Sequence, residues 1–121
     1  MNTEAKLRLI AQAACDKKAE DVIMLDMRRP SQICDYFVIA SGRSTRQVRA
    51  ISDSIEETAR QKGIIPLNIE GYAEGTWVLL DFCDIIAHVF IQDTRSFYGL
   101  ERLWADSPQL EYKEEPFASS L

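Results

Sequence analysis

Two long stretches of the chain carry hydrophobic residues at helical spacing. The first, residues 3–18, repeats them every three or four positions, as one face of a helix does. Its hydrophobic stripe consists of Leu7, Ile10, Ala11 and Ala14. The second begins at Ser44, which forms the S-x-x-Q pattern of a capping box with Gln47, and ends at Gly63. Its inner stripe consists of Val48, Ile51, Ile55 and Ala59.

A third helix is predicted near the end of the chain, with Asp93 or Thr94 as its cap. Its hydrophobic positions are Phe97, Leu100, Leu103 and Trp104. The periodicity stops there, so we expect a single domain over residues 1–104. Residues 105–121 are rich in Ser, Pro and Glu, and we expect an acidic, mobile tail.

Five shorter hydrophobic runs predict strands. They span residues 22–26, 35–41, 66–70, 76–82 and 85–91. The second run is almost continuously hydrophobic, as in a strand that is buried on both faces, and we expect it near the centre of the sheet. The order α-β-β-α-β-β-β-α predicts an α/β (α+β) fold, a mixed five-stranded sheet flanked by helices.

The last two strands are joined at Cys83-Asp84, which reads as a hairpin turn. Because side chains alternate along a strand, such a turn determines which residues share a face. One face, expected to form the core, gathers Thr76, Val78, Leu80, Phe82, Ile85, Ala87, Val89 and Ile91. The opposite face gathers Trp77, Leu79, Asp81, Ile86, His88 and Phe90. Two substantial helices leave little material to cover this second face, so either it docks a partner or the last helix or a loop buries it.

Composition limits the classes of protein. The net charge of −5 argues against holding nucleic acid by bulk electrostatics. Residues 105–121 hold one lysine and four acids, so −3 of that charge lies in the tail and −2 in the body. No run approaches the roughly 18 apolar residues of a spanning helix, and the N-terminus lacks a signal-like run. We therefore expect a cytoplasmic protein without a membrane partner.

Few residues suggest catalysis. Asp81, Asp84 and Asp26 could form a metal-dependent nucleotidyl-transferring site, which is one alternative function. That chemistry calls for a Gly-Ser turn followed by two acids one residue apart on a strand, a pattern missing after Ser41-Gly42. We interpret these acids as turn residues. The three cysteines are odd in number and widely spaced, which fits neither a disulfide framework nor a zinc ribbon. We expect no cofactor, no metal and no enzymatic activity.

A second alternative is an RNA-binding module. Arg43, Arg46 and Arg49 gather at the start of the second helix, where free backbone N–H groups also favour phosphate. The P-loop and dinucleotide spacings are missing, and the arginines equally suit a solvated helix face. RNA contact is therefore at most a secondary interaction.

Several motifs resemble one family, the Iojap-like ribosomal silencing factors. They are Asp35-Tyr36-Phe37-Val38-Ile39-Ala40-Ser41-Gly42, Arg46-Gln47-Val48, Glu70-Gly71, Trp77-Val78-Leu79-Leu80-Asp81-Phe82, His88-Val89-Phe90 and Arg95-Ser96-Phe97-Tyr98-Gly99-Leu100-Glu101. The resemblance runs from about Ala5 to Trp104, which makes residues 1–104 an Iojap-like domain. One departure is Cys83, where the family usually has glycine, so the turn type there stays open.

The resemblance implies a nucleotidyltransferase-like fold without its active site. It also implies binding to the large ribosomal subunit through ribosomal protein L-fourteen, obstruction of subunit joining, repression of translation, and often a homodimer when free. The partner-binding residues predicted on that basis lie on the second hairpin face and the preceding loop. Trp77 and Leu79 are the expected anchors, His88 and Phe90 their neighbours, Glu70, Glu74 and Asp81 an acidic rim, and Tyr72 a further contact.

Overall fold

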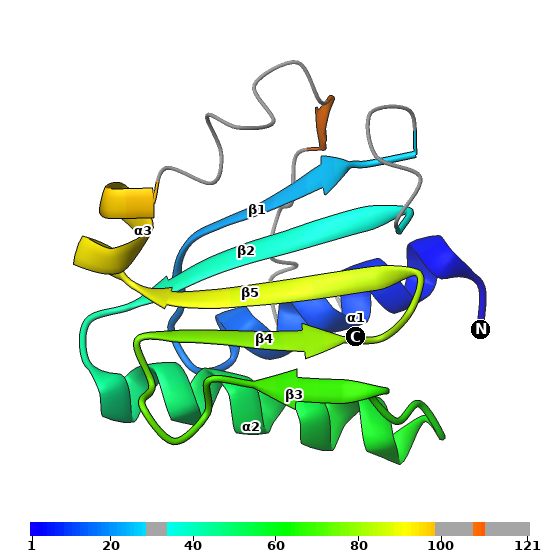
Figure 1. Ribbon diagram of the computed structural model, residues 1–121. Helices are drawn as coiled ribbons and strands as arrows, with labels where there is room; N and C mark the ends of the chain where they lie inside the picture. Colours follow the sequence, from blue (N-terminus) through cyan, green and yellow to red (C-terminus); the bar gives the residue numbers. More distant parts are fainter. Residues whose placement is uncertain (29–33, 99–107, 111–121) are drawn as a thin grey trace, which may run out of the picture.

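The computed structural model describes residues 1–28, 34–98 and 108–110. Three helices and six strands follow one another along this part of the chain (Figure 1). In chain order they are α1 (Thr3–Cys15), β1 (Glu20–Asp26), β2 (Tyr36–Gly42), α2 (Thr45–Gln61), β3 (Asn68–Glu70), β4 (Trp77–Asp81), β5 (Ile85–Ile91), α3 (Gln92–Tyr98) and β6 (Gln109–Leu110).

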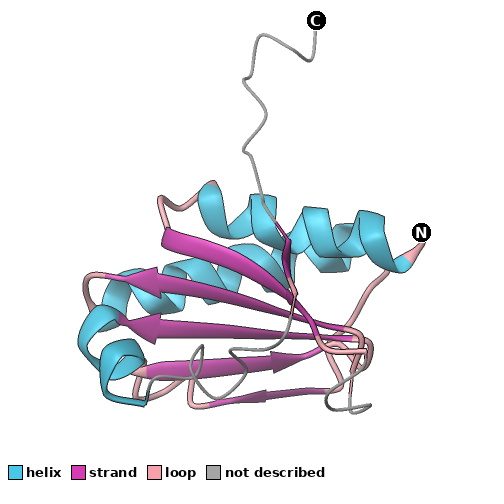
Figure 2. Ribbon diagram, turned by 90° about the horizontal axis from the view of Figure 1, so that it is seen from above, coloured by secondary structure: helices cyan, strands magenta, loops and turns pink. Residues whose placement is uncertain are grey.

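The strands form one mixed sheet in the order β3-β4-β5-β2-β1-β6. The two central strands, β2 and β5, are parallel, and every other neighbouring pair is antiparallel. Helices α1 and α2 lie side by side on one face of this sheet (Figure 2). The predicted mixed sheet flanked by helices is confirmed, and the central place of β2 agrees with its burial at all seven positions.

The sheet has six strands, not the predicted five. The additional strand, β6, lies in the segment that we expected to be a mobile tail and pairs with the edge of β1. The backbone N–H of Asp26 also donates to the carbonyl of Pro108 at 2.8 Å. Two residues are too few to show a hydrophobic period, so no strand could be predicted there. Residues 105–107 and 111–121 lie outside the described residues.

The turn that follows α1 is hydrogen-bonded to the start of α2 by one side chain. The predicted cap is present, since the Ser44 hydroxyl accepts the Gln47 backbone N–H at 3.1 Å. The Gln47 amide, however, does not return to the N–H of Ser44, as a capping box requires. It accepts the N–H of Arg43 at 2.7 Å and donates to the carbonyls of Lys17 and Lys18. A local capping signal is thus used for a long-range contact.

Helix α3 begins at Gln92, immediately after β5 and before the two caps predicted for it. Its residue Arg95 is buried and donates to the hydroxyl of Ser41 and to the carbonyl of Asp21. These bonds fasten α3 to the ends of β2 and β1. The predicted continuation through Leu100, Leu103 and Trp104 lies outside the described residues.

The turn between β4 and β5 is unusually tight. The N–H of Phe82 donates to the carbonyl of Ile85 at 2.9 Å, which confirms the predicted two-residue hairpin. Cys83 has φ 78°, and the N–H of Asp84 donates back to the carbonyl of Phe82 at 3.1 Å. A positive φ with an i to i+2 hydrogen bond is a γ-turn, a strained conformation for a residue with a side chain. Cysteine therefore occupies a position that glycine would fill without strain.

Candidate functional site

The pairing of β4 with β5 gives the hairpin two different faces. Trp77 lies opposite Phe90, Leu79 opposite His88 and Asp81 opposite Ile86. The alternate residues point to α1 and α2 and belong to the main core, where each is at most 3% exposed. They are Val78, Leu80, Phe82, Ile85, Ala87 and Val89. The predicted core face is therefore confirmed at these six positions, whereas Thr76 and Ile91 at its end are only partly buried.

The opposite face holds a second, smaller hydrophobic cluster. Its buried members are Leu25, Met27, Cys34, Phe37, Ile39 and Phe90. Ile23, Trp77 and Ile86 pack against them and are only partly buried. The chain thus buries much of this face while the side chains on β4 keep part of their surface in solvent.

Trp77 sits at the boundary between the buried and the open part of this face. Its ring stacks on that of Phe90 with 4.9 Å between centroids and 29° between planes. Its indole N–H donates to Nδ1 of His88 at 3.2 Å. The ring is half-buried, so it rests on an aromatic base and still contributes to the surface. A ring that is held in place and still partly exposed is suited to contact another surface.

His88 lies under this surface, only 4% exposed. Burial lowers its pKa from 6.5 to about 4, so the ring is neutral near pH 7. Because the indole can only donate, Nδ1 must be the acceptor and the ring proton sits on Nε2. Within the described residues that Nε2 has no hydrogen-bond partner. Phe37 meets the ring edge-on, with centroids 4.7 Å apart.

Phe90 and His88, predicted as neighbours of the anchors, contact Trp77 but offer almost no surface themselves. Phe90 is 0% exposed and His88 nearly so. The surface side of this group is therefore formed by Trp77, Leu79, Asp81 and Ile86. The site list drawn from the sequence omitted Ile86, although strict alternation along β5 had already placed it on this face.

Acidic side chains border the face, as the sequence suggested. Glu70 is exposed on the edge strand β3 and lies directly across from Leu79. Asp81, opposite Asn68, is half-buried and accepts the backbone N–H of Cys83 at 2.8 Å. Glu74 is exposed in the loop between β3 and β4. Two of these acids thus share the face with the anchors, and the third lies in the loop before it.

Tyr72 is not brought together with Trp77. It is 40% exposed, and its hydroxyl donates to Asp53 of α2 at 3.0 Å, on the helix side of the sheet. That hydrogen bond to a carboxylate raises the pKa of the Tyr72 hydroxyl. Arg49 holds the same loop, since it donates to the carbonyl of Ala73. The loop that carries Tyr72 is therefore folded toward α2.

The carboxylates of the catalytic alternative each have a separate partner. Asp84 accepts from Lys6 at 2.6 Å and from the hydroxyl of Thr3, while Asp26 pairs with Arg28. Among the residues that the structure describes, no three His, Cys, Asp or Glu side chains are grouped to hold a metal ion.

A Cys–His nucleophile finds no support either. Burial raises the pKa of Cys34 to about 11, which keeps the thiol protonated, and a thiol is a poor nucleophile. Cys83 is exposed in the turn, whereas His88 is buried.

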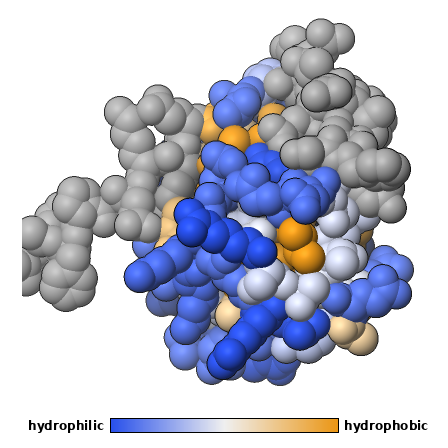
Figure 3. All heavy atoms as spheres, turned by 90° about the vertical axis from the view of Figure 1, so that its left-hand side faces the viewer, coloured by the Kyte–Doolittle hydropathy of each residue, from blue (hydrophilic) through white to orange (hydrophobic). Residues whose placement is uncertain are grey.

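Two of the three arginines considered for RNA binding contact other parts of the protein. Arg43 pairs with Glu20, and Arg49 is engaged with Ala73. The end of the molecule at which α2 begins and α3 follows β5 is largely hydrophilic (Figure 3). Acidic residues such as Glu20 and Asp21 lie among these basic ones, so this end is mixed in charge.

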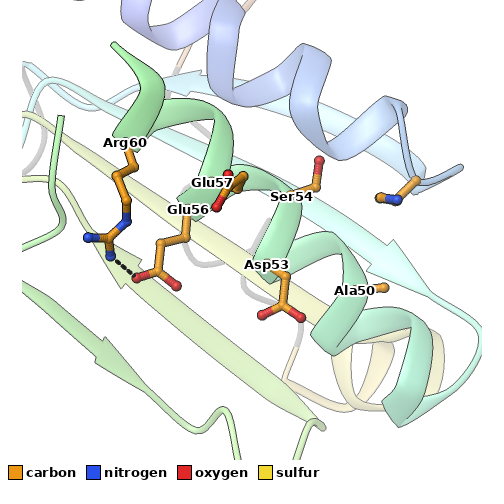
Figure 4. Close-up of a pocket in the computed structure, with 7 residues that line it drawn as sticks. Ala50, Asp53, Ser54, Glu56, Glu57 and Arg60 are labelled. Carbon is orange, nitrogen blue, oxygen red and sulfur yellow. Dashed lines mark hydrogen bonds and ion pairs between the residues drawn. The ribbon is translucent and has the colours of Figure 1, made fainter. Parts of the chain in front are cut away.

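A shallow hollow of about 520 Å³ lies on the outer side of α2 (Figure 4). Its lining consists of Lys17, Ala50, Asp53, Ser54, Glu56, Glu57 and Arg60. Most of these side chains are charged, and Arg60 pairs with Glu56 at 2.8 Å. Small-molecule pockets are mainly apolar, so this hollow is a poor ligand site.

Across residues 1–28, 34–98 and 108–110, no helix combines the length and apolarity needed to span a membrane.

Comparison with known proteins gives one consistent family. A family model described as ribosomal silencing factor during starvation matches residues 1–120. The chain is 45% identical over 108 residues to the ribosomal silencing factor RsfS of Bacillus subtilis, a match that covers 89% of this chain and 92% of the relative. It is 30% identical over 102 residues to the chloroplastic protein Iojap of Zea mays, covering 84% of this chain and 44% of that protein.

Solved structures agree with this result. The crystal structure of a Bacillus halodurans protein is similar, with a TM-score of 0.80 and 41% identity. The match covers 92% of this chain and 100% of that one. A crystal structure of a Chromobacterium violaceum protein gives a TM-score of 0.85 at 30% identity, covering 98% of this chain and 93% of that one. By family model, sequence identity and fold together, the chain belongs to the ribosomal silencing factor family, in which the Iojap proteins are also found.

Proposed function

We propose that this chain binds the large ribosomal subunit through ribosomal protein L-fourteen and represses translation by blocking subunit association. Family membership supports a ribosome-directed role. The single observation that carries the choice of surface is the half-buried indole of Trp77, stacked on Phe90 and hydrogen-bonded to His88. A rigid aromatic ring at the edge of a hydrophobic cluster has the properties of an interface anchor.

The surroundings of Trp77 suit a basic partner. Leu79 and Ile86 extend the apolar surface next to the ring. Glu70 and Asp81 lie on the same face, so negative charge borders the apolar area. Ribosomal proteins that contact RNA are generally basic, and an acidic rim would steer their approach and fix the orientation of the complex.

The proposed mechanism needs no chemical step. A folded domain bound at the joining surface of the large subunit excludes the small subunit by its volume. The carboxylates considered for catalysis are engaged with Lys6, Arg28 and the Cys83 backbone instead of sharing a metal site. We accordingly propose a non-enzymatic regulator that acts in the cytoplasm.

The first test is Trp77→Ala in co-sedimentation with purified large subunits. We expect binding to weaken by more than about 1 kcal/mol, because the aromatic ring that the complex would bury is removed. Ile65→Ala is the matched control, since Ile65 is a large hydrophobe that is 63% exposed in the loop between α2 and β3. Circular dichroism should show both variants folded.

A subunit-joining assay completes this test. Wild-type protein should lower the yield of joined ribosomes, and Trp77→Ala should restore it while Ile65→Ala should not. If Trp77→Ala pellets with large subunits as the wild type does, the assigned face is wrong. If the wild type binds large subunits but leaves joining unaffected, the steric mechanism is wrong.

We further propose that the free chain forms a homodimer and that any RNA contact is secondary. Light scattering during size-exclusion chromatography gives the mass of the free protein directly. Binding to isolated protein L-fourteen should persist at raised salt. Contact made mainly through phosphates would instead fall steeply with salt.

A further inference from the structure

We propose that His88 is a positioning residue of the docking surface, which holds the indole of Trp77 in its binding orientation without touching the partner. This inference rests on the proposed function of the Trp77 face and names a role within it. Trp77 and His88 are diagonal neighbours on β4 and β5, since Trp77 pairs with Phe90 and His88 pairs with Leu79.

Two of the contacts of Trp77 together orient its ring. Stacking on Phe90, with 4.9 Å between centroids, sets the plane of the indole but would also allow the ring flipped over about its Cβ–Cγ bond. The hydrogen bond from the indole nitrogen to Nδ1 of His88, at 3.2 Å, selects one edge of the ring to point inward.

His88 is itself held firmly enough to act as a reference point. It is 4% exposed, and the ring of Phe37 packs edge-on against it with centroids 4.7 Å apart. Its own strand, β5, lies at the centre of the sheet between β2 and β4. A partner cannot reach this buried imidazole, so its effect on binding must pass through Trp77.

Holding a large side chain in its bound orientation favours association, because less conformational freedom is lost when the partner docks. The hydrogen bond is partly buried, and removing its acceptor would take this partner away from the indole N–H. We therefore expect removal of the Nδ1 acceptor to weaken binding to large subunits about fivefold.

The test uses two substitutions of almost equal shape. Asparagine places its Oδ1 where Nδ1 of His88 lies and keeps an acceptor, whereas leucine fills the space without one. We expect His88→Leu to weaken large-subunit binding about fivefold and His88→Asn to stay within about twofold of the wild type. Trp77→Phe keeps a ring but removes the donor, and it should weaken binding by a similar factor. Combining it with His88→Leu should add nothing further.

A second readout follows the hydrogen bond without the ribosome. In ¹⁵N-labelled protein the indole N–H resonance of Trp77, assigned through Trp77→Phe, should shift and exchange faster with solvent in His88→Leu. It should keep its shift and its protection in His88→Asn. A role in general stability alone would not separate these two variants in this way.

Two outcomes would overturn the inference, and they differ from failure of the proposed function. One is that Trp77→Ala loses binding while both His88 variants bind as the wild type does. The other is an indole N–H of equal protection in the leucine and asparagine variants. Failure of the proposed function would instead appear as unchanged binding of Trp77→Ala.

Discussion

Leu79 and Leu80 are neighbours on β4, yet they belong to different parts of the molecule. Leu80 points to α1 and α2 and is 0% exposed, while Leu79 points to the opposite face and remains half-exposed. The same contrast holds along β4, and on β5 it holds at Ile86 only, because His88 and Phe90 are buried. On the helix side, the alternate residues from Val78 to Val89 are sealed in the main core.

This contrast shows how one hairpin can serve both stability and recognition. Two helices cover one face completely, so its side chains contribute to the free energy of folding. The other face has a buried aromatic base under a partly exposed layer. Burying only the base, Phe90 and His88, makes the exposed layer rigid without removing it from the surface.

The largest effect is expected from the matched pair Leu80→Ala and Leu79→Ala, which separates the two faces of β4. We expect Leu80→Ala to lower the free energy of unfolding by about 3 kcal/mol, because it opens a cavity in a packed core. Leu79→Ala should lower it by about 1 kcal/mol or less but weaken large-subunit binding. Urea unfolding and co-sedimentation measure the two effects. Equal losses of stability would show that both faces are equally part of the core.

The protonation of His88 tests whether the layer beneath Trp77 is buried. Its pKa is about 4 in the folded chain against 6.5 for the free group, so the unfolded chain binds an additional proton between these values. The stabilisation is fully present above pH 6.5 and is lost as the pH falls toward 4. From pH 7 to about 4.5 the wild type should lose about 2 kcal/mol more unfolding free energy than His88→Asn. Urea unfolding measured at each pH gives these free energies. The same loss of unfolding free energy in both proteins would contradict a buried, neutral His88 ring.

The acidic rim is tested by reversing one charge. We expect Glu70→Lys to weaken large-subunit binding about threefold at low salt, because an exposed rim charge acts through long-range attraction. The difference should shrink as salt is raised. Glu57→Lys, an equal change at an exposed position on α2, is the control and should have no effect. Equal weakening by both variants would mean that net charge matters and the position of the rim does not.

The smallest expected effect concerns the turn that joins the two faces. Cys83→Gly should raise the free energy of unfolding by about 0.5 kcal/mol, since glycine adopts φ 78° without strain but loses more chain entropy. Thermal unfolding detects the change, and large-subunit binding should stay the same. A loss of stability would show that the Cys83 side chain makes a favourable contact that outweighs the strain.

Sequence periodicity predicted most of the fold because its signals are local. Alternation around Cys83-Asp84 fixed the hairpin register, and therefore the faces of Leu79 and Leu80, since a two-residue turn leaves no freedom in pairing. The strand β6 escaped prediction because two residues carry no period. The changed role of Gln47 escaped as well, because its partners Lys17 and Lys18 lie some thirty positions away.

By itself the sequence determined which residues share a face of the hairpin, the family pattern, and the acids around Trp77. Only the tertiary structure decided how much of that face is open, because exposure depends on segments distant along the chain. It placed Phe90 and His88 beneath the surface and Tyr72 toward α2. It also gave His88 a neutral ring that accepts a hydrogen bond from the indole N–H. Burial and the neighbouring donor, not residue type, set the charge and the tautomer of this ring.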